Sequence, residues 1–275
     1  MIGLTAYLGI ACMIVFGLAL PLTAAVWWVR TRHEKVTTVL AGAATWFLFA
    51  LVLEAAPKAV FLNPALPIGR KVLGSPALYT ALGALMAGVF EETGRLVAFQ
   101  TVLKKRRNRE TAVSHGVGHG GMEAFFLLTV TGAQNLAYAL LIRSGRFGEL
   151  LEAAAAKGVD TAALEALPAQ LAALTPLSAC LALGERVSGM LLHAGLSVLV
   201  FYACKRSRYG LFGLAVLLHA LFDVPAALWQ VGVFPTMYLL EGILFLYAAV
   251  FLAVVIAALY RKDGGAEAAE ADAPV

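Results

Sequence analysis

Charged residues are scarce in this chain of 275 residues. Only 14% of its residues are Asp, Glu, Lys or Arg, whereas 61% are hydrophobic. A soluble domain carries about a quarter charged residues, so this scarcity excludes an ordinary soluble protein and indicates a polytopic membrane protein. The formal net charge of +4 does not indicate nucleic-acid binding. The basic residues lie in short clusters beside apolar segments, where they set membrane topology.

Cysteine pairs, a cleavable leader and internal repeats are also lacking. Cys12, Cys180 and Cys204 are isolated in apolar surroundings without C-x-x-C spacing, so no disulfide framework is expected. No basic segment precedes the first apolar run, which is too long for a secretory signal, so we expect a retained first helix. No repeat indicates an inverted pair of the kind that builds transporters.

Seven apolar stretches are long enough to cross a bilayer. A spanning helix needs about 20 predominantly apolar residues, and the strands of a membrane barrel would be shorter and alternating. The sequence therefore predicts an all-α membrane helix bundle: a single transmembrane domain over residues 1–262, followed by a disordered cytoplasmic tail at 263–275. The expected spans are residues 3–28, 36–56, 76–103, 111–142, 177–203, 210–229 and 234–260.

Basic residues predict the orientation of these spans. If all seven cross the membrane, thirteen of the 21 Lys and Arg residues fall on one side and six on the other. The positive-inside rule then places the N-terminus outside and the C-terminus in the cytoplasm. The outer segment 144–176 is rich in Ala and Leu, and Asp160 is a plausible N-cap for a short helix within it. Glu54, near an outer helix end, is expected to be interfacial.

Ionisable residues lie near the middle of four of the expected spans. Each costs roughly 2.5–3.5 kcal/mol at the centre of a lipid-facing helix. Four helices would not accumulate that cost unless the groups faced inward and satisfied one another. The groups, span by span, are Glu91, Glu92 and Arg95; His115, His119 and Glu123; Glu185, Arg186 and His193; and His219 and Asp223.

These groups share a depth and a helix face. At about 1.5 Å per residue, seven of these residues lie roughly 15–22 Å from the basic residues that flank each span: Glu91, Glu92, His119, Glu123, His193, His219 and Asp223. Residues four apart lie on one face of a helix, and glycines beside the histidines would let neighbouring helices approach closely. A shared polar site inside the membrane is therefore expected. The pairs four apart are Glu91 with Arg95, His115 with His119, His119 with Glu123, and His219 with Asp223.

Such a set can support metal-assisted hydrolysis. Imidazoles from separate helices and a carboxylate can hold zinc with an open position for water, while a second carboxylate acts as general base. Glu91 and Glu92 are adjacent, so one can enter the site while the other pairs with Arg95. Arg186 could neutralise another carboxylate or hold a substrate carbonyl. His115 is expected to be only an interhelical hydrogen-bonding residue.

At these residues the chain resembles a superfamily of intramembrane proteases, which includes the CAAX prenyl endopeptidases, the PrsW proteases and the gamma-secretase scaffold subunit. The matching motifs are Glu91-Glu92-Thr93-Gly94-Arg95, His119-Gly120-Gly121-Met122-Glu123 and His219-Ala220-Leu221-Phe222-Asp223, with Arg186 and His193 on an intervening helix.

Within that superfamily the chain most resembles the YhfC family of intramembrane metalloproteases. The string from His115 to Ala124 carries this likeness, and the resemblance covers residues 83–225, the core site region. His119 stands four residues before Glu123, where related families have an aromatic residue, so either can take the site role. Zinc and a metal-free, glutamate-activated water both stay open.

The resemblance implies a multi-pass protein of the bacterial inner membrane that hydrolyses peptide bonds. Its partners would be the lipid bilayer and a membrane protein or peptide substrate, without nucleic acid. The alternative is a non-catalytic membrane scaffold, or a carrier of metal or protons through the same polar layer. The expected catalytic residues are Glu91, Glu92, Arg95 and Arg186, and the expected zinc ligands are His119, His193, His219, Glu123 and Asp223.

Overall fold

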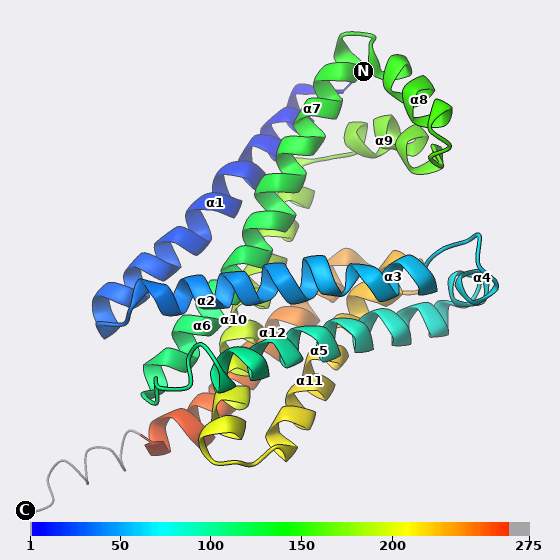
Figure 1. Ribbon diagram of the computed structural model, residues 1–275. Coiled ribbons are helices and arrows are strands. Elements are labelled where there is room, and N and C mark those ends of the chain that lie inside the picture. The colour runs from blue at the N-terminus through cyan, green and yellow to red at the C-terminus, as the bar shows by residue number, and fades with distance from the viewer. Residues whose placement is uncertain (1, 264–275) are drawn as a thin grey trace, which may run out of the picture. The chain divides into compact units, whose positions relative to one another are not determined.

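The computed structural model describes residues 2–263, and this part of the chain contains helices and no strand (Figure 1). The elements are α1 (Leu4–Arg32), α2 (Val36–Trp46), the π-helical segment η1 (Phe47–Leu53), α3 (Ala55–Phe61), α4 (Pro67–Leu73), α5 (Pro76–Gln100), α6 (Arg109–Ala124), the π-helical segment η2 (Phe125–Val130), α7 (Thr131–Arg143), α8 (Phe147–Ala156), α9 (Ala162–Ala172), α10 (Pro176–Lys205), α11 (Gly210–Gln230), α12 (Met237–Val255) and the π-helical segment η3 (Ile256–Tyr260).

The prediction of an all-α, multi-pass membrane protein is confirmed. Within residues 2–263, six helices are long and apolar enough to cross a membrane. A seventh span results if α4 and α5, which meet at 103°, are counted as one bent pair. The orientation of the termini stays a prediction. Of the predicted tail, only Asp263 is described; it is helical and pairs with Lys205 at 2.5 Å, and residues 264–275 lie outside the described part.

By its contacts the described chain divides into two compact units, of which one holds residues 21–123 and 185–263. In this unit α2, η1 and α3 follow one another beside α5 (Figure 1), while α11 packs against both α5 and α12. Its apolar core is built around the second half of α10, where Leu196, Val198 and Tyr202 are completely buried. All four predicted groups of ionisable residues belong to this unit.

Local signals explain where α5 begins. Ser75 is extended and its hydroxyl accepts a hydrogen bond from the backbone N–H of Leu78, at 3.3 Å. Pro76 occupies the first turn, where its missing N–H costs nothing. The preceding α4 also starts on a proline, Pro67, and the chain bends by 103° between α4 and α5.

Two glycines bring α2 and α6 into backbone contact. A Cβ on Gly42 would overlap the carbonyl oxygen of His115, and a Cβ on Gly118 would overlap that of Val39. The contact is therefore reciprocal and leaves no room for a side chain at either position. It agrees with the role predicted for the glycines beside the histidines, and it fixes the helix that carries His119.

The other unit contains residues 2–20 and 124–184. Within it the hydroxyl of Tyr7 donates to the carbonyl of Ala139 at 3.1 Å, and a small core forms around Ile10. The helix predicted after Asp160 is present as α9, but Thr161 is its N-cap. Asp160 instead accepts a hydrogen bond from the N–H of Ala162 at 3.0 Å, so the predicted cap is displaced by one residue.

Candidate functional site

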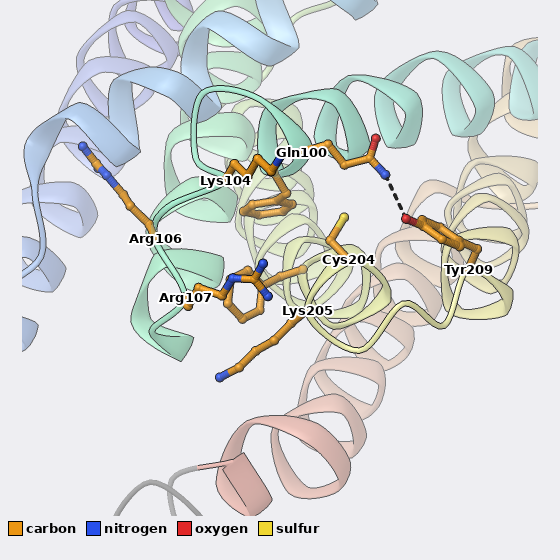
Figure 2. Close-up of a pocket in the computed structure, with 9 residues that line it drawn as sticks. Gln100, Lys104, Arg106, Arg107, Cys204, Lys205 and Tyr209 are labelled. Atoms are coloured by element: carbon orange, nitrogen blue, oxygen red, sulfur yellow. Dashed lines mark hydrogen bonds between the residues drawn. The ribbon is translucent and has the colours of Figure 1, made fainter.

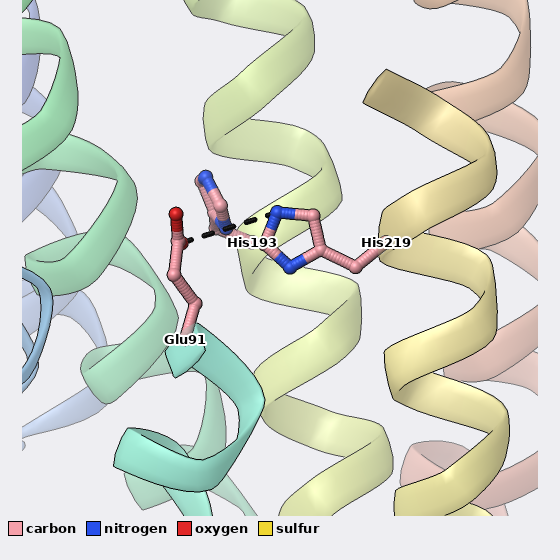
Figure 3. A group of neighbouring side chains, drawn as sticks. All are labelled: Glu91, His193 and His219. Carbon is pink, nitrogen blue, oxygen red and sulfur yellow. Dashed lines mark ion pairs between the residues drawn. The ribbon is translucent and has the colours of Figure 1, made fainter. Parts of the chain in front are cut away.

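Four helices of the larger unit bring the ionisable groups together. Glu91, Glu92 and Arg95 lie on α5, His119 and Glu123 on α6, Arg186 and His193 on α10, and His219 and Asp223 on α11. Figure 3 shows Glu91, His193 and His219 reaching toward one another from three of these helices. The glycine contacts and the packing of α5 against α11 are what allow these side chains to meet.

Glu92 and Arg95 form the innermost part of the site. Both are completely buried, and the Arg95 guanidinium contacts Glu92 at 3.2 Å. Glu92 also accepts a hydrogen bond from Nδ1 of His219 at 2.7 Å. Because Nδ1 carries the proton in this bond, the Nε2 lone pair of a neutral His219 ring is available on the other side. The second carboxylate oxygen of Glu92 has no hydrogen-bond partner within the described chain.

Glu91 lies one step closer to the surface, with its side chain 8% exposed. Nε2 of His119 donates to its carboxylate at 2.8 Å, and Nε2 of His219 lies 3.9 Å from the same oxygen. The ring of His119 is completely buried, and its Nδ1 has no hydrogen-bond partner within the described chain. His119 therefore orients Glu91 toward His219.

His193 connects the buried pair of Glu92 and Arg95 to Glu123, which is more exposed. Arg95 donates to its Nδ1 at 2.6 Å, so a neutral ring carries its proton on Nε2, which contacts Glu123. Glu123 in turn accepts from Arg186 at 2.6 Å, and Arg186 also pairs with Glu185 at 2.5 Å. Both ring nitrogens of His193 thus have partners, and binding a metal through either would require one partner to move.

The donor atoms of this group suit a divalent metal. One ligand atom each from Glu91, His193 and His219 lies within 4.8 Å of the others, and two imidazoles with one carboxylate match a catalytic zinc set. The oxygen of Asp223 lies 3.6 Å from Nε2 of His219. A carboxylate behind a ligating histidine, as Glu92 stands behind His219, is the usual support of such a ligand.

The charges in the site point the same way. Four carboxylates belong to the group, and only two guanidiniums balance them. Glu185, which pairs with Arg186, is a fifth carboxylate beside the group. An excess of buried negative charge is costly in an apolar interior unless a cation compensates it. A bound divalent metal ion would supply that compensation, and so would protons on two members of the group. The carboxylates are Glu91, Glu92, Glu123 and Asp223, and the guanidiniums are those of Arg95 and Arg186.

His115 lies outside this group of contacts. Its Nδ1 is 3.2 Å from the hydroxyl of Ser197 and its Nε2 is 3.3 Å from that of Thr45. Both nitrogens of the buried ring are therefore satisfied by neutral groups on other helices. This geometry agrees with the prediction that His115 joins helices.

A cavity of about 240 Å³ opens beside Asp223. Its walls are largely small apolar residues of α5 and α11, with Tyr79 and Gln230 hydrogen-bonded to each other at 2.9 Å. Glu54 also lines it, is 2% exposed and pairs with Lys58 at 2.9 Å, so it is buried in the protein, and its place at the membrane interface stays a prediction. Sequence reasoning missed this cavity because Ala residues on a helix carry no polar signal.

Nine predicted site residues therefore form one connected network, although their individual roles stay predictions. The candidate metal group contains Glu91, expected as a catalytic residue, together with two of the five expected ligands, His193 and His219. The other expected ligands, His119, Glu123 and Asp223, contact members of this group. Glu92, Arg95 and Arg186 hold the group in place through ion pairs.

Comparison with known proteins identifies the family. The sequence pattern of the YhfC intramembrane metalloprotease family matches residues 16–244. A membrane protein of Bacillus subtilis (strain 168), which carries the name YhfC and the description uncharacterized, is 34% identical over 230 residues, covering 84% of this chain and 87% of the relative. No solved structure matches. With the family pattern extending over most of its length, the chain belongs to the YhfC intramembrane metalloprotease family.

Proposed function

We propose that the protein is an intramembrane metalloprotease that hydrolyses peptide bonds of membrane-embedded or membrane-associated substrates. The observation that carries this proposal is the convergence of Glu91, His193 and His219 within 4.8 Å, inside the membrane-spanning unit. The family to which the chain belongs bears the same description. Peptide hydrolysis at this place needs only water and an extended substrate segment, both of which can reach Asp223 through the adjacent cavity.

In this proposal His193 and His219 would hold the metal, which we infer to be zinc, and Glu91 would lie beside it as the general base. When bound, zinc acts as a Lewis acid toward a peptide carbonyl and makes water more acidic. Glu91 lies beside His193 and His219 and is held less tightly by an arginine than Glu92 is. Arg95 lies 3.9 Å from the Glu91 carboxylate and 3.2 Å from that of Glu92. We assign to Glu91 the uptake of the proton from the attacking water and its delivery to the leaving amine.

The remaining groups have positioning roles. Glu92 fixes the tautomer of His219, and His119 holds the Glu91 carboxylate. Arg95 compensates the charge of Glu92, while Arg186 compensates that of Glu123. The side chain of Asp223 is 31% exposed and lines the cavity, so it would meet the substrate first.

The test combines a cleavage assay with a metal analysis. Wild-type protein and the variants Glu91→Gln and His219→Ala are reconstituted in liposomes with a set of single-span test substrates, and new termini are identified by mass spectrometry. Loss of a general base lowers rates by about 100- to 10,000-fold, so Glu91→Gln should lose cleavage, and His219→Ala should lose it because a metal ligand is removed. His33→Asn is the control, because His33 is exposed, and its φ of 53° is one that Asn also tolerates.

Retained cleavage in both variants would refute the site assignment. Elemental analysis of the purified proteins gives a second, substrate-independent answer, because metal should accompany the wild type and be lost in His219→Ala. If the purified wild-type protein contains no metal, the metalloprotease is excluded, and a metal-free protease or a scaffold is the remaining function. Uptake of zinc into liposomes that contain the protein would favour the carrier, for which the same convergence of His219 and acidic groups would be a transport site.

A further inference from the structure

A second cavity, of about 330 Å³, lies where α5 and α10 end (Figure 2). Gln100 at the end of α5 is nine residues beyond Glu91, so the cavity is about 13 Å further along the helix than the candidate metal group. Phe99 and Phe201 line it, with ring centroids 5.5 Å apart. Its other walls carry four basic side chains, those of Lys104, Arg106, Arg107 and Lys205.

Within the described residues, the positive charge of this cavity is compensated only in part. No carboxylate lines it among the described residues. Lys205 pairs with Asp263 at 2.5 Å, whereas Arg106 donates to the neutral hydroxyl of Thr37 at 2.7 Å. No ion pair joins Lys104 or Arg107 to a carboxylate of the described chain. A cavity of this kind attracts an anion.

The surroundings favour an anion that belongs to a lipid. Val102 is 76% exposed, and Val97 and Leu214, on the helices beside the cavity, are each 42% exposed. In a membrane protein such side chains face acyl chains. Tyr209, which is 53% exposed and accepts a hydrogen bond from Gln100 at 3.3 Å, is typical of the headgroup level (Figure 2). Basic side chains therefore line the cavity, and exposed apolar residues lie close to its lining residues in the sequence.

We propose that this cavity binds the phosphate of an anionic phospholipid headgroup. Basic pockets between transmembrane helices at the cytoplasmic side are suited to such headgroups, and each nearby Lys or Arg contributes about 1 kcal/mol to attraction by an anionic membrane. Lys104 and Arg107, which have no carboxylate partner in the described chain, supply the attraction. Gln100 and Tyr209 offer further hydrogen bonds to the headgroup.

The experiment measures lipid binding to the full-length protein in a neutral detergent, by native mass spectrometry. The probes are short-chain phosphatidylglycerol, short-chain phosphatidylcholine and inorganic phosphate. The test variant is Lys104→Gln with Arg107→Gln, and the control is Lys105→Gln with Lys262→Gln. The control removes the same charge from exposed residues that do not line the cavity.

Preferential binding of phosphatidylglycerol, weakened roughly thirtyfold in the test variant and unchanged in the control, would support the proposal. Equal binding of the two lipids, or equal losses in the two variants, would overturn it. Displacement of the lipid by inorganic phosphate at comparable affinity would also overturn it, because the ligand would then be a soluble phosphate. The single variant Lys104→Gln keeps the test valid if the double variant misfolds, and its affinity for phosphatidylglycerol should fall roughly fivefold.

Discussion

Replacing Arg95 by methionine tests whether the inner ion pair holds the site together. The Arg95 side chain is completely buried and contacts Glu92 at 3.2 Å, Nδ1 of His193 at 2.6 Å and Glu91 at 3.9 Å. Removing one partner of a buried ion pair costs about 3–5 kcal/mol, because the other charge is left without compensation. We therefore expect Arg95→Met to lower the free energy of unfolding by about that amount.

A double variant separates the lost charge from the lost contacts. Glu92→Gln removes the charge that Arg95→Met would strand, and it keeps the shape of the side chain. The two changes together should therefore cost less than Arg95→Met alone, giving an interaction energy of about 1–3 kcal/mol between them. The double variant should not cleave substrates, because Glu92→Gln removes the carboxylate that supports His219.

Unfolding of the purified protein by a denaturing detergent, in mixed micelles, provides the measurement. Arg146→Met is the control, since Arg146 pairs with Glu149 on the surface with both side chains about two-thirds exposed, and little change is expected there. A stability of Arg95→Met within the error of the wild type would refute the reasoning. So would a double variant that is less stable than Arg95→Met.

Three further outcomes can be measured on the same preparations. Gly42→Ala should destabilise the protein by about 1–3 kcal/mol in the same unfolding assay, because its methyl group would overlap the His115 carbonyl; a neutral effect would contradict the close approach of α2 and α6. Asp223→Asn should keep the fold but weaken metal binding about tenfold to hundredfold in a chelator competition, because an acidic neighbour of His219 is lost. Chelation should lower the midpoint of thermal unfolding of the wild type and not that of His219→Ala, and an equal shift in both would contradict the assigned ligand.

The helices could be predicted from the sequence because their determinants are local. Run length and apolar content are properties of each segment, and they gave α1, α10 and α11 within a few residues. The bend of 103° between α4 and α5 was not predicted, since it depends on how the outer segment folds back. The three π-helical segments were also missed, because a widened turn inside an apolar helix leaves no mark on hydropathy.

The site was predictable as a layer but not as a set of contacts. Helical spacing shows that Glu91 and Glu92 lie about 100° apart, and it cannot say which one faces His219. That choice depends on the rotation of α5 against α11. In the structure Glu92 accepts a hydrogen bond from Nδ1 of His219 and pairs with Arg95, while Glu91 accepts a hydrogen bond from His119. The pairing of His193 with Glu123 likewise depends on packing between helices that are distant in sequence.

The exposure of the site decreases steadily from Asp223, at 31%, through Glu91, at 8%, to Glu92 and Arg95, which are sealed. The cavity beside Tyr79 and Gln230 therefore leads to the most exposed end of this series of residues. On the proposed function, an inhibitor that enters through the cavity beside Tyr79 and Gln230 would be narrow and extended, with a metal-binding group at its leading end. The tail of such a compound would then contact the small apolar walls that α5 and α11 give this cavity.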